Sequence, residues 1–373
     1  MRSTIGQLFF IGVSGHSLTA QEKKFIVEND ISGVVLFARN VSTPEQVSLL
    51  CAEIQSLRHQ TASKSPLFIA IDMEGGRVAR LKAPFTVWPP LKHLGDIDSP
   101  AMSFHFAMAM GLELRSVGIN LDFAPCTDTF TNPKNTVIGD RAVSSDPDMV
   151  AKHASALIRG YMKAHVVPCA KHFPGHGHTI IDSHFDLPVE VADLKRLNEV
   201  ELKPFVKSFR SRVPMVMTAH IKFPNVDSQW PVTLSEVFLK KIARDEMRYR
   251  GLIITDDLDM KAMASHYDRA DIPVRSLEAG ADLLLYCNEP DSPPRALDAV
   301  EKAVKDGRVP AAQIQAIFEK VMNLKKEMLT NPEPWPIEKA KQIIGSAHHQ
   351  ALSLAMRENR VLEGLTQPGA AEA

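Results

Sequence analysis

The sequence lacks long apolar stretches, clustered cysteines and an excess of either charge. No apolar run approaches the roughly 20 residues that a helix needs to cross a bilayer, so no membrane-spanning helix is expected. With 43 Lys and Arg against 44 Asp and Glu, the net charge of −1 argues against a broad nucleic-acid or acidic-membrane footprint. The four cysteines form no Cys-x-x-Cys pair, so we expect buried free thiols rather than disulfides.

The chain does have enough apolar residues for a large core. Its 373 residues are 45% hydrophobic and 23% charged, which excludes disorder over most of the length. The apolar segment 8–13 is short and follows a single early cation, Arg2. We therefore interpret it as a buried strand rather than a signal peptide, and expect a cytoplasmic location.

Short apolar runs of strand length recur along the chain, at intervals of roughly 30 to 50 residues. They predict eight strands, at 8–13, 33–37, 67–71, 119–124, 166–170, 215–218, 252–255 and 281–286. Only the fifth run contains a proline, Pro168, which indicates a bulge or a strand end there.

Segments with helical periodicity lie between these runs. Thr43-Pro44 combines a capping residue with a proline at the first helical position, and Asp146-Pro147 repeats the arrangement. We expect helices at 43–57, 101–117, 146–161, 199–209, 236–247, 295–305, 311–328 and 338–362. Alternation of strand and helix requires crossover connections and a parallel sheet buried on both faces.

The expected fold is a single-domain α/β (β/α)8 TIM barrel over residues 1–330, with room for irregular strands. A C-terminal helical extension and a loose tail are expected over residues 331–373. An open doubly wound sheet is the competing architecture, and a Gly-x-Gly-x-x-Gly turn after the first strand would favour it. The segment Gly12-Val13-Ser14-Gly15 lacks that spacing.

Ionisable residues follow several of the apolar runs. Asp72 follows the third run, Lys171 and His172 the fifth, His220 the sixth and Asp256 the seventh. In a barrel these strand ends meet at one rim, where active sites form. One such residue could be a helix cap or a satisfied ion pair, but repetition at the same topological position favours a functional site.

Four of the 14 histidines lie between positions 171 and 184, in a segment that suits a metal site or an acid–base site. No His-Glu-x-x-His motif accompanies them, and Lys171 would repel a bound cation, so we expect no metal. Asp182 and His184 look instead like an acid–base pair, in which the carboxylate fixes the tautomer of the imidazole. Taken alone, an Asp-x-His sequence could equally be a surface pair without function.

Three carboxylates follow the seventh apolar run, in the sequence TDDLDM at 255–260. A carboxylate held at a barrel rim can attack the anomeric carbon of a sugar and form a covalent glycosyl intermediate. Asp256 lies nearest the strand end, where position is defined best. Asp257 or Asp259 could instead cap the next helix.

Four motifs, in this order along the chain, resemble glycoside hydrolase family 3, in particular its compact bacterial β-N-acetylglucosaminidases. They are IDMEGGRVAR at 71–80, VIGDR at 137–141, KHFPGHG at 171–177 followed by DSH at 182–184, and TDDL at 255–258. The resemblance runs from about residue 5 to residue 328 and implies a (β/α)8 barrel.

The resemblance also implies roles for individual residues. Asp256 matches the nucleophile, His184 the general acid/base, and Asp182 the residue that polarises His184. The residues implied to bind the non-reducing-end sugar are Asp72, Arg80, Arg141, Lys171 and His172. Arg80 could alternatively be a structural partner of Asp72 or Glu74, and His176 receives no catalytic role.

The implied activity is that of a retaining exo-β-N-acetylglucosaminidase. Its implied substrates are muropeptide fragments that carry 1,6-anhydro-N-acetylmuramic acid, in peptidoglycan recycling, which bears on cell-wall turnover, cell shape and cell division. A neutral histidine would not repel phosphate as a carboxylate does, so a β-N-acetylglucosaminide phosphorylase on the same fold is the alternative. A non-catalytic sugar-binding protein would need a lost nucleophile or acid, and both are present.

The only expected partner is therefore the small-molecule muropeptide or amino-sugar substrate. We expect no cofactor, no metal, no nucleic acid and no membrane as further partners. A monomer is compatible with the sequence, which leaves the oligomeric state open.

Overall fold

The computed structural model describes residues 1–183 and 185–365 of the chain, and eight parallel strands in it close into a barrel. Around the barrel their order is β1-β10-β9-β8-β7-β6-β3-β2. The strands are β1 (Phe9–Gly12), β2 (Gly33–Leu36), β3 (Phe68–Ile71), β6 (Leu121–Asp122), β7 (Val167–Phe173), β8 (Met215–Thr218), β9 (Leu252–Asp257) and β10 (Leu283–Tyr286). Each matches one predicted run, so the (β/α)8 prediction is confirmed and the doubly wound sheet is excluded.

Two strands extend further than their apolar runs. β7 continues through Lys171 and His172, and β9 continues through Asp256. Pro168 lies inside β7, whereas the irregular register with β8 falls between Ala170 and Phe173. The polar residues at these ends thus lie within the strands rather than in the loops that follow.

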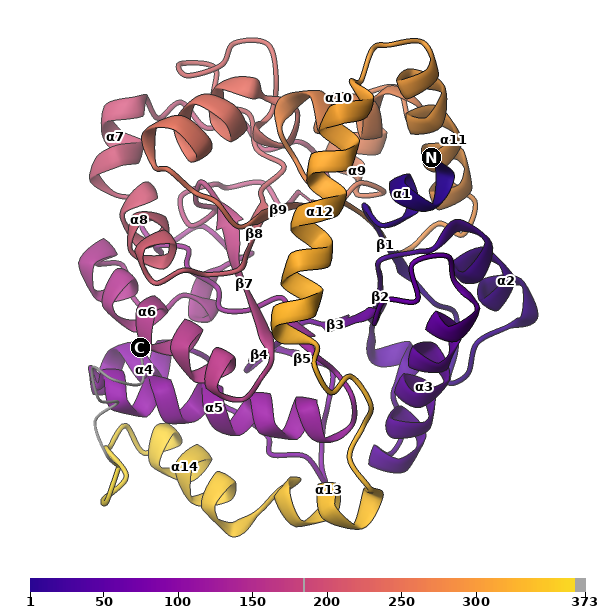
Figure 1. The fold of residues 1–373 in the computed structure, drawn as a ribbon. Coiled ribbons are helices and arrows are strands. Elements are labelled where there is room, and N and C mark those ends of the chain that lie inside the picture. Colours follow the sequence, from indigo (N-terminus) through magenta and orange to yellow (C-terminus); the bar gives the residue numbers. More distant parts are fainter. Residues whose placement is uncertain (184, 366–373) are drawn as a thin grey trace.

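Helices surround the barrel (Figure 1). Before β8 they are α1 (Arg2–Gly6), α2 (Ala20–Asn29), α3 (Pro44–Ser56), α4 (Lys92–Ile97), α5 (Pro100–Ser116), α6 (Pro147–Lys163), α7 (Leu194–Glu199) and α8 (Leu202–Arg210). After it come a π-helix (Val237–Glu246), α9 (Lys261–Ala264), α10 (Asp271–Ala279), α11 (Ser292–Lys305), α12 (Ala311–Met328), α13 (Ile337–Ile343) and α14 (Ala347–Arg357). A small antiparallel hairpin, β4 (Met73–Gly75) and β5 (Val78–Ala79), follows β3.

The capping signals in the sequence act as expected. The side chain of Thr43 accepts a hydrogen bond from Gln46 N, and that of Asp146 accepts one from Asp148 N. The single helix expected at 338–362 is wrong. The chain forms α13 and α14 instead, because Gly345 between them adopts φ +61°, a left-handed conformation that ends a helix.

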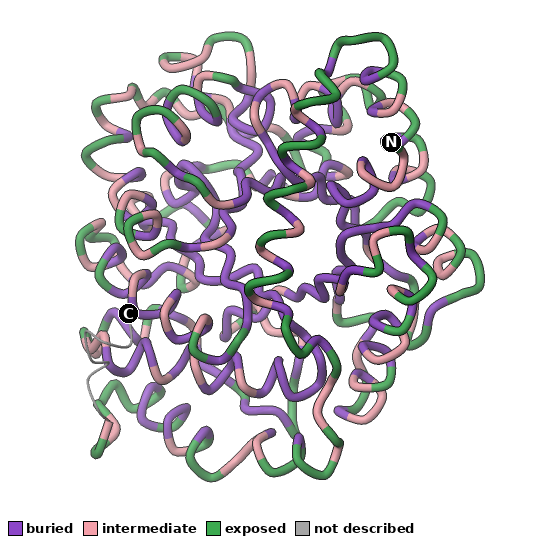
Figure 2. The backbone as a smooth tube through the Cα atoms, in the orientation of Figure 1, coloured by how far each residue is buried: buried purple, intermediate pink, exposed green. Residues whose placement is uncertain are grey.

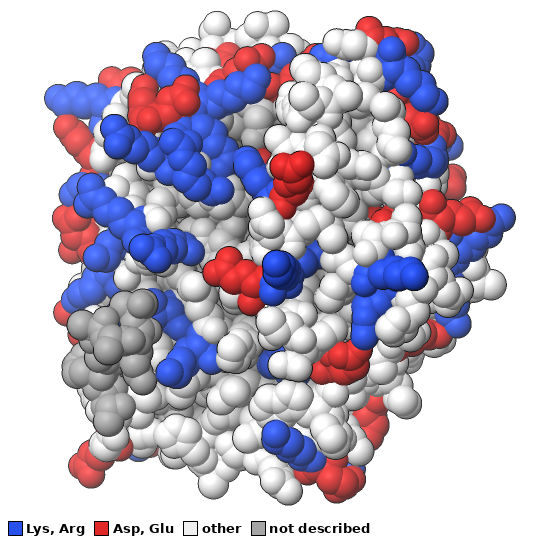
Figure 3. Space-filling model, viewed as in Figure 1, with Lys and Arg blue, Asp and Glu red and all other residues white. Residues whose placement is uncertain are grey.

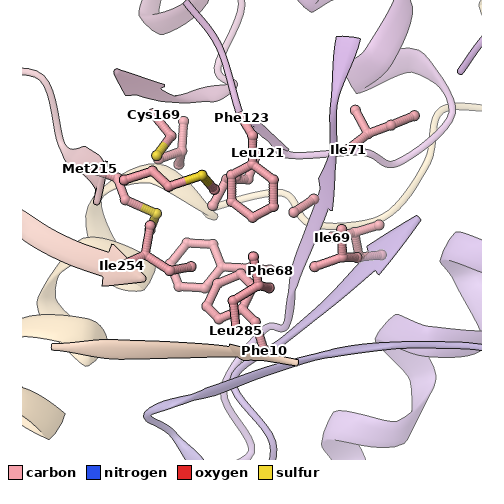
Figure 4. Packing of buried hydrophobic residues seen from close by; sticks show 14 of the residues in the cluster. Phe10, Phe68, Ile69, Ile71, Leu121, Phe123, Cys169, Met215, Ile254 and Leu285 are labelled. Atoms are coloured by element: carbon pink, nitrogen blue, oxygen red, sulfur yellow. The ribbon is translucent and has the colours of Figure 1, made fainter. Parts of the chain in front are cut away.

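Aromatic and aliphatic side chains from the strands fill the barrel (Figure 4). The ring centroids of Phe10 and Phe68 lie 5.5 Å apart, and those of Phe10 and Phe123 lie 6.5 Å apart. Buried residues follow the strands and the inner sides of the helices, whereas exposed residues lie on the outer sides of the helices and in the loops (Figure 2). The interior is therefore a packed core and not a pore.

Helix α12 crosses the amino-terminal mouth of the barrel, in front of the strands in Figure 1. Its Lys325 is 1% exposed, and the ammonium donates to Gln7 Oε1 at 2.7 Å and lies 5.3 Å from the centre of the Phe68 ring. Gln7 lies just before β1 and Phe68 begins β3, so this helix covers the end of the barrel opposite the strand tips.

The C-terminal helices are fastened to the barrel. Glu113 on α5 accepts hydrogen bonds from His349 Nδ1 at 2.7 Å, from Gly345 N at 3.0 Å and from Thr86 Oγ1 at 2.6 Å. Charged side chains of both signs are scattered over the face viewed in Figure 3, with Lys and Arg gathered toward its upper left. All four cysteines are buried free thiols, as predicted. Among the described helices, none is long and apolar enough to cross a membrane.

Candidate active site

One pocket at the carboxyl ends of the strands brings together most of the predicted site residues. Its volume is about 190 Å³, and its lining includes Asp72, Arg80, Arg141, Lys171, His172 and Asp256. Ser183 also lines it, directly after Asp182 in the chain. His184 lies outside the described residues, so its predicted role stays a prediction.

A chain of buried ion pairs forms one wall of this pocket. Lys171 Nζ, at the end of β7, donates to Asp72 Oδ1 at 2.6 Å and pairs with Glu74 Oε1 at 2.8 Å. Arg141 holds the same Glu74 through two hydrogen bonds, from Nε at 2.9 Å and from Nη2 at 2.8 Å. Glu74 is 1% exposed, so its carboxylate has exchanged water for two cations.

Pairing keeps these groups charged in spite of burial. Burial alone would raise the pKa of Glu74, but Arg141 and Lys171 push it far below its usual range. Burial alone would lower the pKa of Lys171, but Asp72 and Glu74 raise it above its usual value. The pocket therefore contains fixed donors and acceptors before any ligand arrives.

Arg80, on the segment after β5, is held more loosely. Its Nη2 lies 3.8 Å from Asp72 Oδ2, and its Nε is a buried donor without a partner among the described residues. Arg80 thus pairs with Asp72, as one interpretation of the sequence expected, and still has a donor to offer within the pocket that it lines.

His172 is held by Asp128, a residue that the sequence patterns did not single out. His172 Nδ1 lies 2.8 Å from Asp128 Oδ2, and Asp128 Oδ1 accepts from His172 N and from His176 N at 3.2 and 2.7 Å. Glu74 was also missed as a site residue, although it lies inside a recognised motif. Neither residue directly follows a predicted apolar run, and the family resemblance assigned neither of them a role in the site.

The two adjacent carboxylates at the end of β9 have different surroundings. Asp257 is anchored, since Oδ2 accepts from Asn288 Nδ2 at 2.6 Å and Oδ1 accepts from Asp259 N at 3.1 Å. Burial and its acidic neighbours raise the pKa of Asp257 to about 7. Asp256 accepts from Asp257 N at 2.8 Å and is half-buried at the pocket wall. Neither Asp257 nor Asp259 caps α9, whose N-cap is Met260.

The arrangement suits recognition and cleavage of a small polyhydroxylated ligand. Lys171, Arg141 and Arg80 are donors for hydroxyl groups, Asp72 is an acceptor, and Asp256 is a carboxylate at a defined strand end. In the described part of the chain, no group of three or more His, Cys, Asp or Glu side chains is arranged to hold a metal ion.

Comparisons with known proteins point in the same direction. Residues 1–324 match the glycosyl hydrolase family 3 N terminal domain. A β-hexosaminidase from Nitrosospira multiformis is 38% identical over 288 residues, covering 76% of this chain and 80% of the relative. A β-hexosaminidase from Pseudomonas aeruginosa is 34% identical over 293 residues, covering 78% of this chain and 86% of the relative.

Solved structures resemble the whole barrel. The crystal structure of native NagZ from Neisseria gonorrhoeae has a TM-score of 0.77 and 31% identity, and the match covers 95% of this chain and 98% of that one. The structure of a glycoside hydrolase family 3 β-N-acetylglucosaminidase from Paenibacillus sp. has a TM-score of 0.89 and 33% identity, with coverage of 96% of this chain and 68% of that one.

Proposed function

Since the chain belongs to glycosyl hydrolase family 3 and is an enzyme of the β-hexosaminidase type, we propose that it is a retaining exo-β-N-acetylglucosaminidase. The observation that carries the proposal is the convergence of Asp72, Arg80, Arg141, Lys171, His172 and Asp256 on one pocket. These residues come from separate parts of the chain, and each matches a position of the family motifs.

The proposed reaction is a double displacement. Asp256 attacks the anomeric carbon, a carboxylate–carbon bond forms, and the glycosidic carbon–oxygen bond breaks while His184 donates a proton to the leaving oxygen. Water then attacks the same carbon, gives its proton to His184 and releases Asp256 together with N-acetylglucosamine. Asp182 is assigned the role of stabilising the imidazolium form of His184, which is present before the first step and again after the second.

The pocket supports action on a terminal sugar. Its volume of about 190 Å³ is below the roughly 300–1,000 Å³ of sites that enclose drug-sized ligands. Asp72, Lys171 and Arg141 are ion-paired in advance, so binding of the sugar hydroxyls requires little reorganisation of the protein. A single non-reducing-end residue is the ligand that such a pocket suits best.

The substrate we propose is a muropeptide fragment that carries 1,6-anhydro-N-acetylmuramic acid, handled in the cytoplasm during peptidoglycan recycling. Its support is the family resemblance together with the match to NagZ over 98% of that chain. Incubation with the anhydro-disaccharide peptide should release free N-acetylglucosamine and the anhydromuramyl peptide, both detected by mass spectrometry. An uncleaved muropeptide, with a simple aryl glycoside cleaved, would contradict this substrate.

The activity itself is tested with aryl β-N-acetylglucosaminide and aryl β-glucoside, each with and without phosphate. We expect cleavage of the first substrate, much weaker cleavage of the second, and free sugar as the product in both buffers. Accumulation of a sugar 1-phosphate would establish the phosphorylase instead, which the β-hexosaminidase relatives do not favour.

A further inference from the structure

A buried carboxylate behind the pocket connects two histidines with different tasks. Asp128, in the segment after β6, is fully buried and does not line the pocket itself. It faces His172 Nδ1 at 2.8 Å and accepts from the backbone N–H groups of His172 and His176. Burial alone would raise the pKa of Asp128, but the nearby His172 and His176 lower it to about 2. Asp128 is therefore an ionised acceptor at neutral pH.

The ionised state of Asp128 determines the tautomer of His172. A carboxylate can only accept hydrogen bonds, so the ring nitrogen that faces it, Nδ1, must hold a proton. The other ring nitrogen, Nε2, is then the atom that His172 offers within the pocket it lines. In the neutral ring Nε2 is an acceptor, the complement of the donors on Lys171 and Arg141.

The same carboxylate also holds the beginning of the segment that leads to Asp182. Asp128 Oδ1 accepts from His176 N, and the His176 ring is enclosed by that segment. Thr179 Oγ1 donates to His176 O at 3.0 Å, so it accepts the proton of His176 Nδ1 at 2.6 Å. His176 Nε2 faces Ser183 Oγ at 3.4 Å. Burial lowers the pKa of His176 to about 4, so this ring is neutral at physiological pH.

We propose that Asp128 is a positioning residue for the sugar-cleaving reaction. It holds His172 in the Nδ1–H tautomer, so that Nε2 accepts a hydrogen bond from a sugar hydroxyl. Through the backbone N–H of His176, it also fixes the beginning of the 176–183 segment. This inference rests on the proposed function, because it assigns His172 a sugar ligand. Outer partners of this kind orient a functional histidine without touching the ligand.

The substitution Asp128→Asn should change the tautomer of His172 while keeping the size of the side chain at position 128 and its hydrogen bonds to the backbone. The amide oxygen can still accept from the two backbone N–H groups, while the amide NH₂ must face His172 Nδ1. The His172 ring then loses its Nδ1 proton and places its proton on Nε2, so it donates where it accepted before. The matched control is Asp98→Asn, because Asp98 lies 3.2 Å from His153 Nε2 in an Asp–His pair away from the pocket.

The experiment combines kinetics with ¹⁵N NMR of histidine-labelled protein, in which His172→Gln identifies the resonances of His172. We expect Asp128→Asn to lower kcat/KM on aryl β-N-acetylglucosaminide about 10- to 100-fold. The ¹⁵N shifts of Nδ1 and Nε2 of His172 should exchange character, and Asp98→Asn should keep wild-type kinetics. In a His172→Gln background, Asp128→Asn should cost much less than it does alone.

Three results would overturn the inference. They are wild-type kcat/KM in a folded Asp128→Asn protein, an undiminished cost in the His172→Gln background, and a wild-type spectrum with the proton of His172 on Nε2. The last needs only the wild-type protein, so it decides even where the variant does not fold. Failure of the proposed function is a separate outcome, since the wild-type enzyme would then not cleave the aryl glycoside at all.

Discussion

Two lysines are buried at opposite ends of the barrel, and their surroundings differ in one respect. Lys171, 2% exposed at the strand tips, is paired with the carboxylates of Asp72 and Glu74. Lys325, 1% exposed on α12, has as partners the amide oxygen of Gln7 and the ring of Phe68. Burial alone would lower the pKa of both amines. Asp72 and Glu74 raise the pKa of Lys171 above its usual value, whereas burial lowers that of Lys325 to about 7.

The difference shows what the pocket end of the barrel requires. A cation that donates to sugar hydroxyls must stay charged after water is removed, and only neighbouring anions achieve that. The covered end has no such requirement, so an amine with a pKa near neutrality is tolerated there. Substitutions at the two ends should therefore have effects of different kinds, on catalysis at one end and on stability at the other.

The largest expected effect is that of Lys171→Met. It removes a proposed donor to the sugar and leaves the half-buried Asp72 and the buried Glu74 short of a partner. Loss of one partner of a buried ion pair typically costs about 3–5 kcal/mol. We expect kcat/KM to fall about 1,000-fold, with Lys325→Met as the matched control that stays within about twofold of wild type. Similar losses of kcat/KM in both variants would contradict the proposed difference between the two ends of the barrel.

Glu74→Gln should have the next largest effect. The amide keeps the shape but removes the negative charge that Lys171 and Arg141 share, so the two cations repel each other. We expect a rise in KM of about 10- to 100-fold on aryl β-N-acetylglucosaminide, with a smaller change in kcat. Glu113→Gln is the control, a buried carboxylate that binds His349 instead, and it should lower stability while leaving KM unchanged.

Lys325 should make stability depend on pH. Its folded pKa of about 7 lies below the ordinary 10.5, so between these values the unfolded state binds more protons than the folded state. The destabilisation is complete below pH 7 and fades as the pH rises toward 10.5. Urea unfolding at pH 7 and pH 9 should show a gain of about 2 kcal/mol in the wild type beyond that in Lys325→Met. If the free energy of unfolding changes equally with pH in the wild type and in Lys325→Met, the amine of Lys325 stays charged in the folded protein.

The smallest effect is expected for Arg80→Lys. The charge remains, but the planar fork is lost at a site where the existing pair with Asp72 is long, at 3.8 Å. We expect kcat/KM to fall about tenfold, or roughly 1.4 kcal/mol. A loss as large as that of Lys171→Met would show that Arg80 contacts the sugar through both of its arms.

Apolar runs were sufficient to predict the barrel, because each strand is buried on both faces and shows as an uninterrupted hydrophobic segment. Helix α2 was not predicted, since in it only Ile26 and Asn29 are buried and no apolar stripe stands out. The break between α13 and α14 depends on the left-handed conformation of Gly345, which hydrophobic periodicity does not register.

The candidate site was predictable where its residues follow apolar runs or match motif positions. Asp72, Lys171, His172 and Asp256 satisfy both conditions, and all four line the pocket. Glu74 and Asp128 contact other site residues, and those contacts depend on distances that only the folded chain defines. Asp128 in particular lies in an irregular segment between β6 and α6, where neither periodicity nor spacing singles it out.

The most direct test of the account is to trap the covalent intermediate on Asp256. A 5-fluoro N-acetylglucosaminyl fluoride transfers its sugar to the nucleophile of a retaining enzyme, and the glycosyl-enzyme is then hydrolysed slowly. Peptide mapping by mass spectrometry can therefore locate the attached sugar. We predict the label on the peptide that contains Asp256, its loss in Asp256→Ala and its retention in Asp259→Asn. A label on another residue, or hydrolysis with inverted anomeric configuration and no label, would contradict the assignment.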